Sequence, residues 1–238
     1  MKILCISDQI DPVVYSSAIK DRFADVDLVL SAGDLPMDYL EFIVSSLNKP
    51  LLFVFGNHNL EEYHYYGNST DLTGWSEAIE PYHSSGAVHV GFKVRREGGL
   101  IVAGLEGSMK YNRGENQYTN SQMMWAILKL VPVLLINRIF RGRFLDILLT
   151  HASPLGIHDK NDPCHRGFKA FLWFMKVFKP KYLIHGHIHL YDLSAVRATT
   201  YRETLVLNAY SHYVIDTGET IGRIAPLRSV LPDIFSPP

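Results

Sequence analysis

The stretch KYLIHGHIHL, residues 181–190, joins an apolar run to three histidines spaced two residues apart. The run Tyr182-Leu183-Ile184 is short and followed by Gly186, which is typical of a strand that ends in a loop. Side chains alternate along extended chain, so His187 and His189 face the same side. Neutral imidazole nitrogens are good ligands for transition metals. A metal site is one interpretation, a polar loop rich in histidine is the other, and these residues alone do not decide between them.

Apolar runs of strand length alternate with helical patterns along the rest of the chain. Strands are predicted at 2–7, 27–31, 51–55, 88–95, 100–104, 145–150 and 182–185, and as a pair near 204–216. Helices are predicted around 15–23, from Pro36 to about 47, and around 166–178. Gly98-Gly99 indicates a hairpin between two of the strands. Helices among the early strands and hairpins among the later ones predict an α/β layered fold with a mixed sheet.

A single domain over residues 1–238 is expected, because the chain of 238 residues is 47% hydrophobic and shows no linker or repeat. The net charge of −1 gives no electrostatic reason to expect nucleic-acid binding. The two cysteines are too few for a disulfide framework, and the N-terminus reads as a first strand and not as a signal peptide. We therefore expect a cytoplasmic protein.

Polar residues follow five of the predicted strands at the point where each ends. They are Asp8, Asp34, Asn57 with His58, His151, and His187 with His189. Binding sites in α/β sheets assemble at the carboxyl ends of strands, and scattered core histidines would not follow strand polarity in this way. The pattern favours the interpretation that the histidines are ligands.

This set holds two carboxylates, an amide and several imidazoles, but no thiolate. Oxygen and nitrogen ligands suit Mn, Fe or Zn. Six or more ligands exceed what one tetrahedral ion takes, so two divalent transition metal ions are expected. Two such ions can bind a phosphate and generate hydroxide as the nucleophile. The sequence therefore predicts a dinuclear site for a small phosphate-ester substrate.

The ordered motifs ISD, GD, GNHN, TH and GHIH, from Asp8 to His189, resemble the calcineurin-like metallophosphoesterase superfamily. The pattern of that superfamily is D-x-H, GD, GNH followed by Asp or Glu, H, and GHxH. The resemblance implies a β-sandwich flanked by helices. It also implies a metal-dependent phosphoesterase that hydrolyses a phosphomonoester or phosphodiester through a metal-bound hydroxide.

The resemblance further implies a role for each site residue. Asp34 would bridge the two ions, and Asp8 and His189 would bind the first. The second ion would be held by Asn57, His151 and His187. His58 would bind no metal, but would contact the phosphate and act as a general acid on the leaving group.

Two residues depart from the superfamily pattern. Ile10 stands where D-x-H has its histidine, which removes one ligand from the first metal site. Asp11 could replace it, or could be an ordinary turn residue before Pro12. Asn59 follows GNH, so a charge that could orient His58 is missing. These departures keep open a catalytically weakened binding or scaffold protein with the same fold.

The apolar segment at about 121–143 contains Lys129 and Pro132. Its uninterrupted apolar pieces are shorter than the roughly 20 residues of a membrane span. A buried helix pair or a helical flap over a pocket is expected, and no transmembrane segment. Arg138, Arg141 and Arg143 leave peripheral contact with a membrane open. Elsewhere, His165 or Arg166 could bind a substrate phosphate or be exposed to solvent. The sequence does not predict the oligomeric state.

Overall fold

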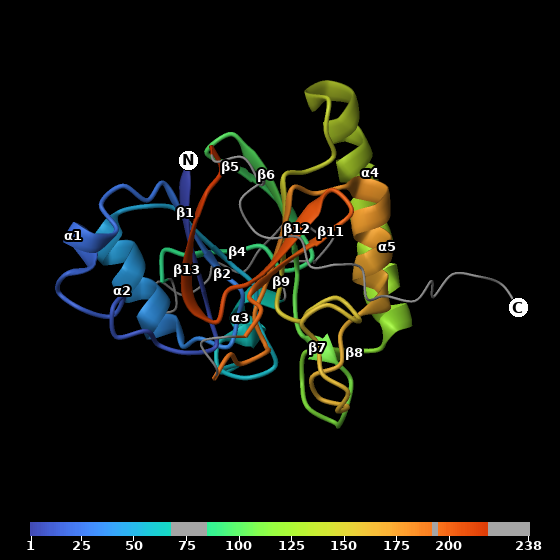
Figure 1. The fold of residues 1–238 in the computed structure, drawn as a ribbon, viewed down its shortest axis with the longest axis horizontal. Helices are drawn as coiled ribbons and strands as arrows, with labels where there is room; N and C mark the ends of the chain where they lie inside the picture. The colour runs from blue at the N-terminus through green and yellow to red at the C-terminus, as the bar shows by residue number, and fades with distance from the viewer. Residues whose placement is uncertain (68–84, 192–194, 219–238) are drawn as a thin grey trace, which may run out of the picture.

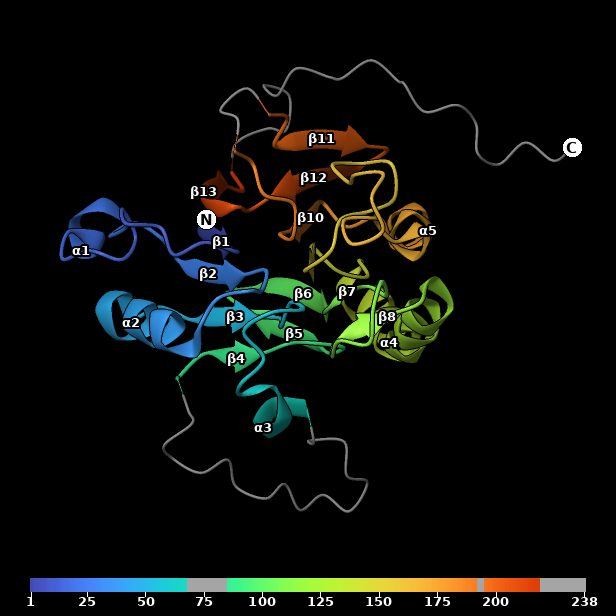
Figure 2. The same ribbon diagram turned by 90° about the horizontal axis from the view of Figure 1, so that it is seen from below.

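The structure is a computed structural model that describes residues 1–67, 85–191 and 195–218. Two mixed sheets are stacked between two layers of helices (Figures 1 and 2). The helices are α1 (Ile19–Arg22), α2 (Met37–Leu47), α3 (Tyr63–Gly67), α4 (Asn120–Arg141) and α5 (Lys169–Phe178). Figure 2 shows α1 and α2 on one side of the molecule and α4 and α5 on the other.

The first sheet has the strand order β13-β1-β2-β3-β4. Its parallel strands are β1 (Lys2–Ser7), β2 (Leu28–Ser31), β3 (Leu51–Phe53) and β4 (Val88–His89). The edge strand β13 (Ser211–Asp216) runs antiparallel to β1, with Lys2 opposite Asp216 and Ser7 opposite Ser211.

The second sheet has the order β11-β12-β10-β9-β6-β5. Its parallel strands are β6 (Leu100–Leu105), β9 (Ile147–Thr150), β10 (Tyr182–His185) and β12 (Thr204–Asn208). The antiparallel edges are β5 (Val94–Glu97) and β11 (Ala198–Tyr201). A separate short pair is formed by β7 (Ser108–Met109) and β8 (Gln117–Tyr118).

The core is divided into three apolar layers, one between the sheets and one beneath each pair of helices. Strand β1 shows why its sequence is apolar at almost every position. Ile3 and Cys5 pack between the sheets, whereas Leu4 and Ile6 pack on the side of α1 and α2. A strand covered on both faces has no exposed side on which polar residues could alternate.

The predicted α/β sandwich flanked by helices is confirmed, and β1 and β10 have the predicted bounds. Two details of the strand prediction are wrong. The run 88–95 is two strands, β4 in the first sheet and β5 in the second. The predicted strand pair near 204–216 does not form, because β12 pairs with β10 and β11 while β13 crosses to β1.

Residues 120–141 form one continuous helix and not the expected helix pair. The side chain of Thr119 accepts from the backbone of Gln122 and the Gln122 side chain accepts from the backbone of Thr119, which caps the first turn. Gly142 ends the helix with a left-handed φ of 72°. The helix is long and apolar enough to cross a membrane by length and composition. One stripe of it is nevertheless packed on the core and on α5.

Candidate metal centre

The loop after β2 places Asp34 at the centre of the site. Gly33 and Asp34 both have left-handed backbone, with φ of 97° and 57°. The backbone N–H of His58 donates to Asp34 Oδ1 at 2.8 Å, and the Asn59 amide donates to the Asp34 carbonyl at 3.0 Å. A Cβ at position 56 would collide with Asp34 Oδ1, so only glycine allows this approach. The loops after β2 and β3 are thereby locked together.

His151, directly after β9, is fully buried and held in one orientation. Its Nδ1 donates to the Ala32 carbonyl at 2.7 Å, so in the neutral ring Nε2 carries the lone pair. That Nε2 lies 3.4 Å from Asp34 Oδ2 and 3.2 Å from Asn57 Oδ1. Three atoms that all offer lone pairs therefore converge, and only a proton or a cation between them makes the arrangement favourable.

The electrostatics of this cluster favour a positive charge at its centre. Burial disfavours the imidazolium form of His151, but the carboxylates of Asp34 and Asp8 outweigh it and raise the pKa of His151 to about 9. Burial likewise disfavours ionised Asp34, yet His151 and the His58 amide hold the pKa of Asp34 well below its usual range. A divalent cation can take the place of that proton.

His187 completes the group on the loop after β10. Its Nε2 donates to the Cys164 carbonyl at 2.7 Å, which leaves Nδ1 free as a ligand. Burial, reinforced by the charge of His151, lowers the pKa of His187 to about 3, so its ring is neutral. Ligand atoms of Asp34, His151 and His187 all lie within 4.8 Å of one another. The structure thus brings together four predicted ligands of the second ion, Asn57 included.

Asp8 and His189 lie beside this group in a looser arrangement. The backbone N–H of His187 donates to both oxygens of Asp8, at 2.9 and 3.0 Å. His189 Nε2 is 3.8 Å from Asp8 Oδ1, and its Nδ1 is hydrogen-bonded to the Tyr191 hydroxyl at 2.7 Å. Burial raises the pKa of Asp8 against the opposing charge of His151. The two side chains face each other but offer fewer converging ligand atoms than the cluster around His151.

Ile10 and Asp11 occupy places that bear on the first ion. The Ile10 side chain is 43% exposed. Asp11 is buried, and its Oδ2 accepts from the hydroxyl of Ser211 and from His212 Nδ1 at 2.5 Å, while its Oδ1 accepts from the Val13 N–H at 2.7 Å. The carboxylate of Asp11 is therefore engaged in tying the first loop to β13.

His58 has an exposed side chain, and its backbone N–H anchors Asp34. His185, the first histidine of the opening motif, is fully buried and is not part of the group of converging ligand atoms. It pairs with His158, whose Nδ1 lies 2.9 Å from His185 Nε2. His165 lies against His187, with ring centroids 5.4 Å apart, and hydrogen-bonds to Asp162. Arg166 lines a separate cavity of about 500 Å³ with Lys110 and Lys169.

Sequence reasoning missed three buried residues that support these loops. Glu106 follows β6, accepts from the Phe55 N–H and contacts His89 Nε2 at 2.6 Å. Asn208 ends β12 and donates to the Ile188 carbonyl at 2.7 Å. Asn116 donates to the Gly56 carbonyl at 2.7 Å. Glu106 and Asn208 could have been found, since each ends an apolar strand as the predicted ligands do.

A family model, calcineurin-like phosphoesterase, matches residues 1–191. The chain belongs to the calcineurin-like phosphoesterase family. No curated protein matches the sequence. One solved structure has a TM-score of 0.61 at 14% identity and covers 90% of this chain and 94% of its own. The protein TT1561 of Thermus thermophilus has a TM-score of 0.57 at 13% identity, covering 88% of this chain and 89% of that one.

A protein described as a novel archaeal phosphodiesterase is 13% identical, with a TM-score of 0.43 and coverage of 91% of this chain and 94% of that one. At such low identity the two structures with TM-scores of 0.61 and 0.57 support the fold alone. The assignment of site residues in this calcineurin-like phosphoesterase is therefore based on the geometry of its own structure. Its centre offers a carboxylate, an amide oxygen and two imidazoles, and this donor set fits Mn, Fe or Zn.

Proposed function

We propose that the protein is a metal-dependent phosphoesterase that hydrolyses a phosphomonoester or a phosphodiester. The observation that supports this most is the convergence of His151 Nε2 with Asp34 Oδ2 and Asn57 Oδ1, each of which presents a lone pair. A bound divalent ion would supply Lewis acidity toward a phosphate oxygen and lower the pKa of water. The family resemblance agrees with this class of reaction.

The residues that would hold metal fall into two groups of different quality. Asp34, Asn57, His151 and His187 form the compact group, and two of them have tautomers fixed by backbone carbonyls. Asp8 and His189, with Asp34, form the other, where Ile10 provides no ligand atom. We infer that both groups bind divalent transition ions and that the compact group binds more tightly.

His58 is the candidate general acid. Its backbone is fixed by the hydrogen bond to Asp34, so the ring lies at the rim of the centre, while the exposed side chain is free to reach a substrate. In this position it would orient the phosphate and deliver a proton to the departing alkoxide oxygen. The Asn59 amide, bonded to the Asp34 carbonyl, keeps this turn in place without adding a charge.

A weakened scaffold protein of the same fold is the second candidate. The exposed apolar side chain of Ile10 favours it, because the first ion would lack one nitrogen ligand. The catalyst and the scaffold differ in how their hydrolytic activity responds to added metal. A catalyst gains hydrolytic activity when the first group is filled by excess Mn or Zn, whereas a scaffold binds metal and stays inactive.

The test measures metal content and metal-dependent hydrolysis of phosphomonoesters, linear and cyclic phosphodiesters, dinucleotides and lipid phosphates. We expect hydrolysis of one class that is lost with chelator and with His151→Ala. A matched control is His64→Ala, whose side chain is 70% exposed and lies outside the centre. Full metal loading without hydrolysis of any class would support the scaffold, and a chain that binds no metal would overturn both.

A further inference from the structure

The outer face of α4 is apolar where a surface helix of a globular protein is normally polar. Its buried stripe is Met123, Ile127, Leu130, Leu134 and Asn137. This spacing of four and three residues packs one side of the helix on the core. The opposite side exposes large apolar side chains: Trp125 67%, Leu128 41%, Val133 44%, Leu135 49%, Ile136 52%, Ile139 75% and Phe140 78%.

Such a helix cannot cross a bilayer while its buried stripe is part of the core. It can lie along a surface, because its exposed apolar side chains extend from Trp125 to Phe140. Lys129 is the single charged residue among the outward positions between Trp125 and Leu135. An exposed face of this kind marks a contact with another apolar phase.

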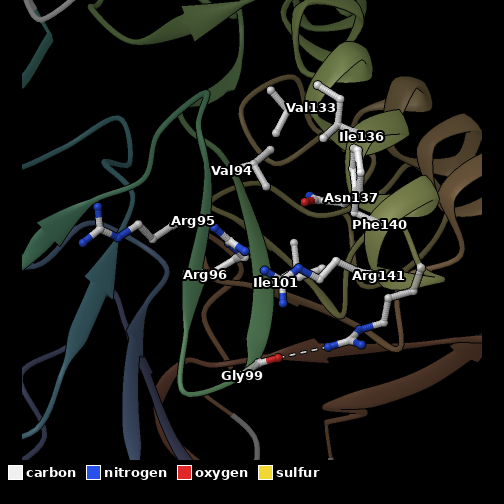
Figure 3. Close-up of a pocket in the computed structure, with 11 residues that line it drawn as sticks. Val94, Arg95, Arg96, Gly99, Ile101, Val133, Ile136, Asn137, Phe140 and Arg141 are labelled. Carbon is white, nitrogen blue, oxygen red and sulfur yellow. Dashed lines mark hydrogen bonds between the residues drawn. The ribbon is translucent and has the colours of Figure 1, made fainter.

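Cationic groups gather at the C-terminal end of this face. Figure 3 shows a cavity of about 930 Å³ between α4 and the β5–β6 hairpin, lined by Val133, Ile136 and Phe140 on one side. Its cationic lining residues are Arg95, Arg96, Arg141 and Arg143. In Figure 3 Arg95 extends away from α4. Arg143 is hydrogen-bonded to Asp146 and to the Gly99 carbonyl, which fixes it at the turn of the hairpin.

This concentration of arginines contrasts with the net charge of −1 of the whole chain. Residues 120–141 include no Asp or Glu. A second copy that docked through the same helix would bring no carboxylate of its own α4 to these guanidinium groups, because a two-fold contact uses the same patch on both chains. A bilayer with anionic headgroups supplies both the negative charge and the apolar phase.

We propose that the outer face of α4, with the arginines at its C-terminal end, docks on a bilayer that contains anionic phospholipid. The helix lies in the plane of the interface, with Ile136, Ile139 and Phe140 inserted among the acyl chains. Arg96 and Arg141 pair with lipid phosphates at the mouth of the cavity. Trp125 lies at the headgroup level near the other end of the helix, where indole rings are favoured.

The test is flotation of the purified protein with vesicles of phosphatidylcholine alone and of phosphatidylcholine mixed with phosphatidylglycerol. Binding is expected on the mixed vesicles and is expected to fall steeply with added salt. Removing the insertion with Ile139→Ser and Phe140→Ser should reduce partitioning about tenfold or more. Removing charge with Arg96→Gln and Arg141→Gln should also reduce it about tenfold.

Matched controls carry the same number of changes on other surfaces. Val196→Ser with Val214→Ser alters side chains that are 48% and 37% exposed, and Lys20→Gln with Arg22→Gln alters cations on α1. Both controls should float like the wild type. The tryptophan emission should shift to the blue on mixed vesicles, and Trp125→Phe should remove that shift. Unchanged thermal unfolding of each variant shows that the fold is intact.

Failure of the wild type to float with the mixed vesicles would overturn the proposal. Flotation that is insensitive to both α4 variants would overturn it as well. A dimer in sedimentation that Ile139→Ser with Phe140→Ser dissociates, without vesicle binding, would assign the face to a contact between copies of the chain. None of these readouts depends on phosphoesterase activity, so they stand apart from the proposed function.

Discussion

At the scale of single residues, the donor atoms of the centre are set by backbone hydrogen bonds. The Ala32 carbonyl fixes His151 with Nε2 toward Asp34, and the Cys164 carbonyl fixes His187 with Nδ1 free. In both bonds the acceptor is a backbone carbonyl that lies outside the motifs. The sequence motifs therefore supply the ligand residues. Which ring nitrogen of each histidine is left free to bind metal is decided by carbonyls in loops far away along the chain.

His58→Ala should lower turnover while metal content stays unchanged, because the side chain is exposed and only the backbone N–H holds Asp34. A general acid contributes about 10²–10⁴-fold, so a loss in this range is expected with a poor leaving group. The loss should shrink with a nitrophenyl ester, whose leaving group hardly needs a proton. Metal analysis and kinetics of both substrates check this, with His64→Ala as control. Loss of metal from His58→Ala would contradict the assigned role.

Ile10→His should strengthen metal binding at the first group, because it adds a nitrogen donor two residues from Asp8 on the same side of extended chain. The variant should retain metal at chelator concentrations that strip the wild type, and Ile10→Leu should not. Asp11→Ala, in contrast, should leave metal affinity almost unchanged, since the Asp11 carboxylate is bonded to Ser211 and His212. A loss of metal from Asp11→Ala alone would show that Asp11 is the replacement ligand.

At the scale of elements, the end of β10 is held by a series of hydrogen bonds through two neutral histidines, His185 and His158. His185 Nδ1 donates to the Gly186 carbonyl at 2.9 Å, so its Nε2 must accept from His158 Nδ1. His158 Nε2 then accepts from the Thr199 hydroxyl at 2.8 Å. Every partner is satisfied only when both rings are uncharged. This explains why His185, which precedes the GHIH stretch, is structural although it lies only two residues from the predicted ligand His187.

Acidification should destabilise the protein through this pair. Burial lowers the pKa of His158 from 6.5 to about 4. Between these two pH values His158 is protonated in the unfolded chain but neutral in the folded protein. The stabilisation is present above pH 6.5 and is lost as the pH falls toward 4. His158→Asn keeps a residue that tolerates the left-handed φ of 60°. The free energy of unfolding, measured with urea, should fall between about pH 7 and pH 5 in both proteins. The fall should be larger in the wild type than in this variant, by up to roughly 2 kcal/mol. An equal fall in the free energy of unfolding of the wild type and of His158→Asn would show that His158 is protonated in the folded protein.

At the scale of the whole molecule, the centre joins the two sheets. Asp34 and Asn57 follow strands of the first sheet, whereas His151 and His187 follow strands of the second. A metal bound between them should therefore oppose separation of the sheets. Because only the folded chain brings these donors together, binding adds to the free energy of unfolding.

Addition of Mn or Zn to chelator-treated protein should raise the melting temperature. At a free metal concentration about 100 times Kd, bound metal should increase the free energy of unfolding by about 2.7 kcal/mol. Stepwise chelation should release two classes of metal, with the class held by Asn57, His151 and His187 leaving last. His151→Ala should abolish the stabilisation, and His64→Ala should not. Simultaneous release of two equivalent ions would contradict the inferred order of affinity.

The sequence by itself predicted most strands of the two sheets, the polar residues that follow them and the residue types of the candidate centre. Short apolar runs bounded by glycine have few alternatives to strands, and parallel strands have their carboxyl ends at one edge of the sheet. Asp8, Asp34, Asn57 and His151 could therefore be predicted from local pattern. His187 was predicted in the same way. These signals lie within a few residues of each other along the chain.

Only the tertiary structure decided which donors form a compact group, what Asp11 binds and which face of α4 is buried. Asp11 meets β13 from about 200 positions away, as the Ser211 bond with a separation of 200 residues shows. The course of β13 back to β1 was missed because strand pairing depends on distant backbone hydrogen bonds. Hydropathy alone also cannot tell the packed side of α4 from its outer side, since both are apolar. Contacts between distant segments settle such choices, and no local pattern encodes them.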